Sequence, residues 1–222
     1  SESVVAEFPK SAVSESFRNL RSSLFLNAGH EQSKVILITS SQPQDGKSFI
    51  SFNLASSIAS VGYKTILIDC DLRRPTLHSK LRIENRVGLT NYMTKNASVD
   101  DIIRHTNIEN LSFILAGPVI PNPSEMMELG VLDSLINDLK SRYDYIIIDT
   151  TPVGIVADAT LMMKYASKVL MVMRNNYTRK DILINVINNL KTNKLNNYDI
   201  VYNDLNLHKS SYRHYSNYYI KN

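Results

Sequence analysis

A polar loop between two apolar segments carries the clearest chemical signal in the sequence. Residues 41–48 read Ser-Gln-Pro-Gln-Asp-Gly-Lys-Ser and lie between a β-rich run at 34–39 and a helical pattern at 48–60. This is the spacing of a P-loop, with serine in place of the first glycine. Backbone N–H groups of such a loop, with the N-terminus of the next helix, bind phosphate groups. The predicted nucleotide-binding residues are Ser41, Gln42, Pro43, Gln44, Asp45, Gly46, Lys47 and Ser48.

The end of this loop holds two side chains with predicted roles of their own. Lys47 is expected to reach the terminal phosphates, and the Ser48 hydroxyl is expected to bind Mg²⁺. Gly46 allows the backbone to turn where a Cβ atom would interfere. ATP and Mg²⁺ are therefore the predicted ligands.

Carboxylates close two other apolar runs. Asp69 and Asp71 follow the run at 66–68, and Asp149 follows the run at 146–148. Side chains of a strand alternate with period two, so Asp69 and Asp71 would point the same way if the chain stays extended. Paired carboxylates can bind Mg²⁺ and accept a proton from an attacking hydroxyl. The predicted catalytic residues are Lys47, Asp69, Asp71 and Asp149, with Ser48, Asp71 and Asp149 on the metal.

The spacing of these residues assigns their chemical roles only in part. Asp69 is the candidate base and Asp71 the candidate metal ligand, but sequence spacing allows the reverse. Arg73 or Arg74 is expected to add positive charge near the phosphates. Asp158 is interpreted as a helix-surface residue, and Asn203 as a contact of the adenine.

The elements that must position these residues alternate between strand and helix patterns. Strands are predicted at 34–39, 65–69, 111–115, 145–149, 168–173 and 198–202. Helices are predicted at 11–26, 48–60, 124–141 and 179–191. Strands that are apolar throughout indicate a parallel sheet covered by helices on both faces. The fold class is therefore α/β and P-loop NTPase-like, and a ligand is expected at the carboxyl ends of the strands.

Composition narrows the class of protein. The 222 residues are 43% hydrophobic and 21% charged, which is typical of a globular chain. No apolar run approaches the ~18 residues of a membrane helix, and the first residues lack the pattern of a signal peptide. The single cysteine, Cys70, excludes a disulfide framework and fits a reducing cytosol. The net charge of +4 is carried by residues 179–222, too few charges for nucleic acid to be the expected partner.

Both ends of the chain carry a further pattern. Glu15, Arg18 and Arg21 recur every three residues on the first predicted helix. Spacing alone fits either an ion pair within the helix or a contact between chains. Residues 208–222 have no apolar periodicity and are predicted to form a flexible tail beyond a domain at 1–207. The tail holds a tyrosine cluster, Tyr212, Tyr215, Tyr218 and Tyr219.

Taken in order, these motifs resemble those of the bacterial tyrosine kinases, over nearly the whole chain. The Walker A, Walker A′ and Walker B motifs of that family match 41–48, 66–73 and 146–149. The resemblance implies an ATP-dependent protein-tyrosine kinase that phosphorylates its own tyrosine cluster in trans. It also implies ring assembly through Glu15, Arg18 and Arg21.

The resemblance is to the Gram-positive type that regulates capsule or exopolysaccharide synthesis and export. It implies a separate transmembrane activator, a polysaccharide co-polymerase adaptor, and a cognate phosphotyrosine phosphatase. The kinase itself would be cytoplasmic and recruited to the inner face of the membrane.

Three other functions stay open at this point. A partitioning or division ATPase shares the P-loop, but that group typically has an early lysine where this chain has Gln42. A non-catalytic nucleotide-binding regulator of a membrane polymerase would not need the acidic residues. DNA binding through the basic end would show as a strongly salt-dependent affinity.

Overall fold

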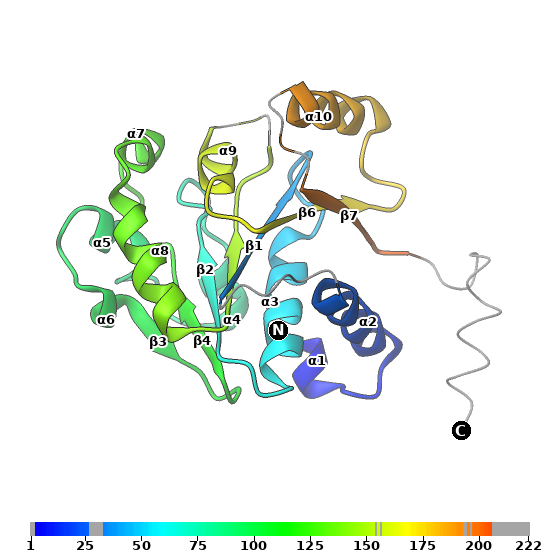
Figure 1. Ribbon diagram of the computed structural model, residues 1–222, viewed down its shortest axis with the longest axis horizontal. Coiled ribbons are helices and arrows are strands. Elements are labelled where there is room, and N and C mark those ends of the chain that lie inside the picture. The colour runs from blue at the N-terminus through cyan, green and yellow to red at the C-terminus, as the bar shows by residue number, and fades with distance from the viewer. Residues whose placement is uncertain are drawn as a thin grey trace.

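The centre of the molecule is a seven-stranded sheet in the order β3-β4-β2-β5-β1-β6-β7 (Figure 1). The computed structural model describes residues 3–26, 33–153, 155, 157–192, 195 and 197–205. The strands are β1 (Lys34–Ser40), β2 (Thr65–Asp69), β3 (Ile103–His105), β4 (Leu111–Ile114), β5 (Tyr145–Asp149), β6 (Lys168–Arg174) and β7 (Tyr198–Asn203). All strand pairs are parallel except β3 with β4.

Helices precede and connect these strands. They are α1 (Val4–Glu7), α2 (Ala12–Leu26), α3 (Lys47–Ala59), α4 (Leu77–Leu81), α5 (Leu89–Met93), α6 (Val99–Ile102), α7 (Pro123–Glu128), α8 (Val131–Arg142), α9 (Asp158–Met163) and α10 (Lys180–Thr192). Within the described ranges, none is long and apolar enough to cross a membrane.

The two faces of the sheet belong to two separate hydrophobic clusters. Alternate residues of each central strand enter different clusters: Ile146 and Ile148 of β5 face one, and Ile147 faces the other. The first cluster is completed by α8, α9 and α10, and the second by α1, α2 and α3. Figure 1 shows α1, α2 and α3 packed together beside the sheet. Helices on both faces explain why the strands are apolar throughout, as the α/β prediction requires.

The fold differs from the sequence prediction at several elements: the short helices α1, α4, α5 and α6 were not predicted, and two further differences have clear local causes. The helix expected at 124–141 is broken into α7 and α8, because Gly130 adopts the left-handed conformation with φ of 71°. The spacing of apolar residues continues across the break, so the sequence pattern did not indicate that the helix is interrupted. The short antiparallel strand β3 was not predicted, since three residues are too few for a period-two pattern to show.

Strand order places the polar strand ends at one edge of the sheet. β5 lies between β1 and β2, and the register pairs Asp69 directly with Asp149. The P-loop follows the neighbouring strand β1. Three segments that are far apart in the sequence therefore converge at the carboxyl ends of β1, β2 and β5.

Candidate active site

The P-loop leaves β1 at Ser40 and turns into α3 at Lys47. Gly46 has φ of 100°, in the left-handed region that favours glycine. A Cβ atom there would lie 2.2 Å from Nδ2 of Asn203, so a larger residue would also displace the Asn203 amide. The side chain of Lys47 is 9% exposed, and Asp45 is fully buried. The loop thus presents its backbone at the start of a 13-residue helix, as a phosphate site requires.

Neighbouring segments hold the two glutamines of the loop. The side-chain Nε2 of Gln42 donates to the Tyr177 carbonyl at 3.3 Å, and the side-chain Oε1 of Gln42 accepts from the backbone N–H of Arg179 at 3.3 Å. The Tyr177 hydroxyl lies 3.2 Å from Oε1 of Gln44. Gln44 has φ of 66°, which costs about 1 kcal/mol for a residue with a side chain. These contacts from the β6–α10 turn offset that strain.

Asp69 and Asp149 form a buried pair of like charges. Each is 1% exposed, and they are neighbours in the register of β2 and β5. Burial raises the pKa of Asp69 well above its ordinary value, and the Asp149 charge raises it further. Burial also raises the pKa of Asp149, although a hydrogen bond from Ser48 and the Lys47 charge oppose this. Asp69 Oδ2 and Asp149 Oδ1 have no hydrogen-bond partner among the described residues.

Asp71 lies beside this pair but in a different conformation from the one predicted. The strand ends at Asp69, so the period-two argument does not reach Asp71. Its N–H donates to Asp69 Oδ1 at 3.2 Å, and its carboxylate accepts from Arg74 N–H at 3.1 Å. Its pKa is raised by burial, and the Lys47 charge acts in the opposite direction. The turn keeps Asp71 within the field of the P-loop lysine.

Asp158 is not on the helix surface, as the sequence interpretation had it, but fully buried at the start of α9. It accepts from Arg73 Nε at 2.9 Å and also from the Ser124 hydroxyl. A second Arg73 nitrogen donates to Ser124 Oγ at 2.7 Å. The Arg73 guanidinium is therefore engaged with α7 and α9. The predicted charge of Arg73 or Arg74 near the phosphates stays a prediction.

Lys80 on α4 is an exposed residue whose charge acts on the buried carboxylates, and sequence reasoning missed it. Desolvation lowers the pKa of its ammonium group, and the charges of Asp149 and Asp69 raise it while Lys47 lowers it further. Lys80 thus brings a second cation into the field of the buried carboxylates. No motif covers it, because α4 has only five residues and follows an irregular turn.

The residues predicted to bind Mg²⁺ fit that ion when its phosphate ligands are included. Mg²⁺ usually takes one or two carboxylates, with substrate phosphates and water completing the octahedron. Ser48 and Asp149 are hydrogen-bonded to each other, and Asp149 Oδ1 has a free acceptor position. The described residues, those of this site included, contain no group of three or more His, Cys, Asp or Glu that could hold a metal by itself, so the phosphate oxygens are needed to complete the site.

A groove of about 650 Å³ adjoins the P-loop. Its walls come from α2, the first turn of α3 and the end of β7. The apolar part of the lining is Ala12, Val13, Phe17, Leu20, Phe49, Ile50, Ile200, Val201, Tyr202 and Leu205. Asn203 also lines it, but its amide nitrogen donates to the Asp45 carbonyl at 2.9 Å. The predicted adenine contact of Asn203 stays a prediction.

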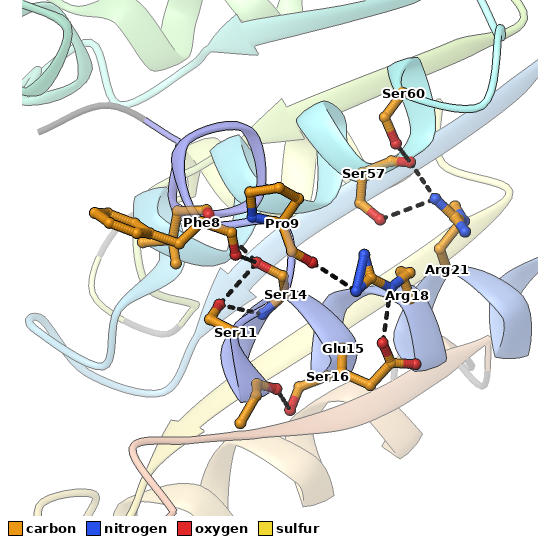
Figure 2. A network of polar contacts seen from close by, with 12 residues as sticks. Phe8, Pro9, Ser11, Ser14, Glu15, Ser16, Arg18, Arg21, Ser57 and Ser60 are labelled. Atoms are coloured by element: carbon orange, nitrogen blue, oxygen red, sulfur yellow. Dashed lines mark hydrogen bonds and ion pairs between the residues drawn. The ribbon is translucent and has the colours of Figure 1, made fainter. Parts of the chain in front are cut away.

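The charged stripe of α2 makes contacts within the chain (Figure 2). Arg18 Nε pairs with Glu15 at 2.8 Å, and a second Arg18 nitrogen donates to the Pro9 carbonyl at 2.6 Å. Arg21 donates to the Ser57 carbonyl at 2.5 Å. A role for these residues between chains stays a prediction. Tyr212, Tyr215, Tyr218 and Tyr219 lie outside the described residues.

Known proteins resemble the chain over most of its length. The family described as AAA domain matches residues 33–200. CapB of Staphylococcus aureus is 38% identical over 168 residues, covering 76% of this chain and 74% of that protein. The tyrosine-protein kinase YwqD of Bacillus subtilis is 36% identical over 173 residues, covering 78% and 73%.

Solved structures agree with this sequence similarity. The chimerical protein CapA2B2 superposes with a TM-score of 0.86 at 34% identity, covering 91% of this chain and 89% of the other. The kinase domain of the Escherichia coli tyrosine kinase ETK gives 0.88 at 27% identity, covering 96% and 84%. The septum site-determining protein MinD of Pyrococcus horikoshii, complexed with Mg-ADP, gives 0.63 at 23% identity and shares the fold.

Proposed function

Because the chain belongs to the bacterial tyrosine-protein kinase family, and its residues 33–200 match the AAA-domain model, we propose that it transfers the γ-phosphoryl group of ATP to tyrosine hydroxyls. The observation that carries this proposal is the buried pair of Asp69 and Asp149 beside Lys47 of the P-loop. A loop that binds phosphates explains nucleotide binding alone. A second, unpartnered carboxylate supplies what transfer to a hydroxyl also needs, a proton acceptor.

The chain's own residues divide the work of transfer. The loop backbone and Lys47 bind the β- and γ-phosphates and stabilise the charge that develops on them. The tyrosine oxygen attacks the γ-phosphorus, the bond to the β-phosphate oxygen breaks, and ADP leaves. Asp69 takes the tyrosine proton on its unpartnered Oδ2. A pKa raised by burial makes the Asp69 carboxylate a stronger base toward a hydroxyl whose own pKa is about 10.

Metal binding falls to Ser48, Asp149 and Asp71. Mg²⁺, when bound there, supplies neutralising charge to the phosphate oxygens. Asp71 is the assigned metal-side carboxylate, because its turn leaves it less buried than Asp69. The groove between α2 and β7 is the assigned adenine site, since its aromatic and aliphatic lining adjoins the first turn of α3.

The substrate we assign first is the chain's own tyrosine cluster, Tyr212, Tyr215, Tyr218 and Tyr219, presented in trans by a neighbouring copy. In this account residues 1–207 are the kinase domain and 208–222 the substrate tail. Neighbouring copies form a ring through Glu15, Arg18 and Arg21. Each phosphotyrosine adds about −1.5 to −2 charges, so two would cancel most or all of the +4 of residues 179–222, three would reverse its sign, and the ring would loosen.

We place this activity in the control of capsular or extracellular polysaccharide synthesis and export. The kinase would be cytoplasmic and held at the inner face of the membrane by a transmembrane activator, with a phosphotyrosine phosphatase reversing the reaction. Support for this context is the similarity to CapB and to the CapA2B2 chimera.

The test is the intact mass of the purified chain after incubation with ATP and Mg²⁺, with and without the cytoplasmic segment of the membrane partner. We expect a ladder of phosphate additions that maps to residues 212–219. Lys47→Met is the control and should give no additions while keeping the parent circular dichroism spectrum. Release of inorganic phosphate without any addition would contradict the kinase and favour an ATPase switch.

A further inference from the structure

Asp45 places a carboxylate inside a loop that binds anions, where it would be expected to repel phosphate. The side chain is fully buried and both of its oxygens have partners. Oδ1 accepts from the Thr178 hydroxyl at 2.7 Å, and Oδ2 accepts from the N–H of Gln42 at 3.4 Å. The Asp45 carboxylate is thus hydrogen-bonded to the β6–α10 turn through one oxygen and to the backbone of its own loop through the other.

The direction of the Thr178 hydrogen bond is fixed by a third partner. Thr178 Oγ1 accepts the N–H of Arg174 at 2.6 Å, which leaves its proton for Asp45. Arg174 is the last residue of β6, so the contact starts from the sheet itself. A rigid strand end therefore determines where the Asp45 carboxylate sits.

A second tie reaches the same residue from the edge strand. Asn203, the last residue of β7, donates its amide N–H to the Asp45 carbonyl at 2.9 Å. It approaches so closely that a Cβ at Gly46 would lie 2.2 Å from the amide nitrogen. The Asp45 side chain is thus held by the turn that follows β6, and the Asp45 carbonyl is held by the last residue of β7.

We propose that Thr178 and Asn203 are positioning residues that act through Asp45 to hold the P-loop in its phosphate-binding conformation before nucleotide arrives. The inference rests on the proposed function in one respect, that the P-loop binds the phosphates of ATP. A loop already held in the bound geometry loses less conformational freedom on binding, and the affinity rises accordingly. Without these two hydrogen bonds, fewer contacts would hold Gln44 in its strained backbone conformation.

The experiment compares Thr178→Val, Thr178→Ser and Asn203→Ala in the full chain. Isothermal titration calorimetry gives the Kd of each for Mg-ADP and for inorganic tripolyphosphate with Mg²⁺, and thermal unfolding gives its stability. Tripolyphosphate lacks adenine, so it separates an effect on the loop from lost contact with the base. Thr192→Val is the matched control, because its hydroxyl bonds to the Asn188 carbonyl on the exposed face of α10.

We expect Thr178→Val and Asn203→Ala to weaken both ligands about tenfold, the effect of losing one hydrogen bond to a charged or buried acceptor. Thr178→Ser and Thr192→Val should stay within twofold of the parent. A Kd within twofold for Thr178→Val, or a loss in Thr178→Ser as large as in Thr178→Val, would overturn the proposal. So would a loss in Asn203→Ala that affects ADP but not tripolyphosphate.

The outcome is distinct from that of the kinase test. If the variants bind tripolyphosphate as expected and the parent never phosphorylates tyrosine, the positioning roles stand and the proposed function fails. A parent that binds neither ligand would overturn both.

Discussion

Removing one charge from the buried carboxylate pair should make the folded protein more stable at alkaline pH. Asp69→Asn is the informative change, because the carboxamide oxygen can still accept the Asp71 N–H bond that Oδ1 accepts now. Its amide nitrogen would replace Oδ2, which accepts no hydrogen bond among the described residues. The substitution therefore removes one of the two charges and keeps the hydrogen bond from Asp71.

The size of the effect follows from the register of the two strands. Asp69 and Asp149 are direct neighbours, and adjacent strands lie roughly 5 Å apart. Two charges at that separation repel by about 3 kcal/mol at an effective dielectric constant of about 20. Lys47 and Lys80 offset part of this, so we expect Asp69→Asn to raise the free energy of unfolding by about 1–3 kcal/mol at pH 8.5.

The pH dependence has a definite sign. The folded-state pKa of Asp69 is raised well above the unfolded value, so at a pH between these two values the folded protein holds a proton that the unfolded chain has released. The cost of the charge is fully present above the folded pKa and disappears as the pH falls toward the unfolded value of about 3.9. The gain from Asp69→Asn should therefore be smaller at pH 5 than at pH 8.5.

Urea unfolding at several pH values measures this directly, and a cycle with Asp149→Asn isolates the pair. Both single changes relieve the same repulsion, so the double variant should gain less than the sum of the two. The reasoning would be refuted by a loss of stability in Asp69→Asn at pH 8.5, by a gain that is the same at every pH, or by additive single effects.

Two further predictions concern a buried ion pair and the conformation of two glycines. Arg73→Met should lower the free energy of unfolding by about 2–4 kcal/mol in urea, because it leaves the buried Asp158 carboxylate without its cation. Asp158→Asn should lower it by only about 1 kcal/mol, because the arginine that it leaves unpaired is partly exposed. A larger loss for Asp158→Asn than for Arg73→Met would contradict this assignment. Gly62→Ala should cost about 1–2 kcal/mol, because φ is 96° with no atom near the new Cβ. Gly88→Ala should cost at least about 2 kcal/mol more, since its Cβ would lie 2.2 Å from the Leu115 carbonyl oxygen; equal melting temperatures for the two would refute this.

The parts of the site that were predictable are those encoded by neighbours in the sequence. The P-loop is one continuous segment between a strand and a helix, and Asp69 and Asp149 each close an apolar run. Strand patterning then places them at one edge of a parallel sheet, as the structure has them. These inferences needed only local spacing and the general rule for open α/β sheets.

The parts that were missed depend on contacts between distant segments. Arg73 and Asp158 are 85 residues apart, and the sequence around either residue does not indicate that the two form a pair. Asn203 reaches Asp45 across 158 residues, which no periodicity encodes. For Asp71 the argument from alternation did not apply, because β2 ends at Asp69 and a turn sets the position of the Asp71 carboxylate.

The measurement that tests the central claim most directly is a transfer between two chains that each lack half of the reaction. One chain carries Lys47→Met and keeps its tyrosines, and the other keeps Lys47 but has phenylalanine at 212, 215, 218 and 219. After mixing with ATP and Mg²⁺, intact mass should show phosphate on the Lys47→Met chain only, mapped to its tyrosine cluster. Phosphate on neither chain, although wild-type protein is phosphorylated beside it, would contradict transfer in trans, and phosphate at other residues would contradict the assigned substrate.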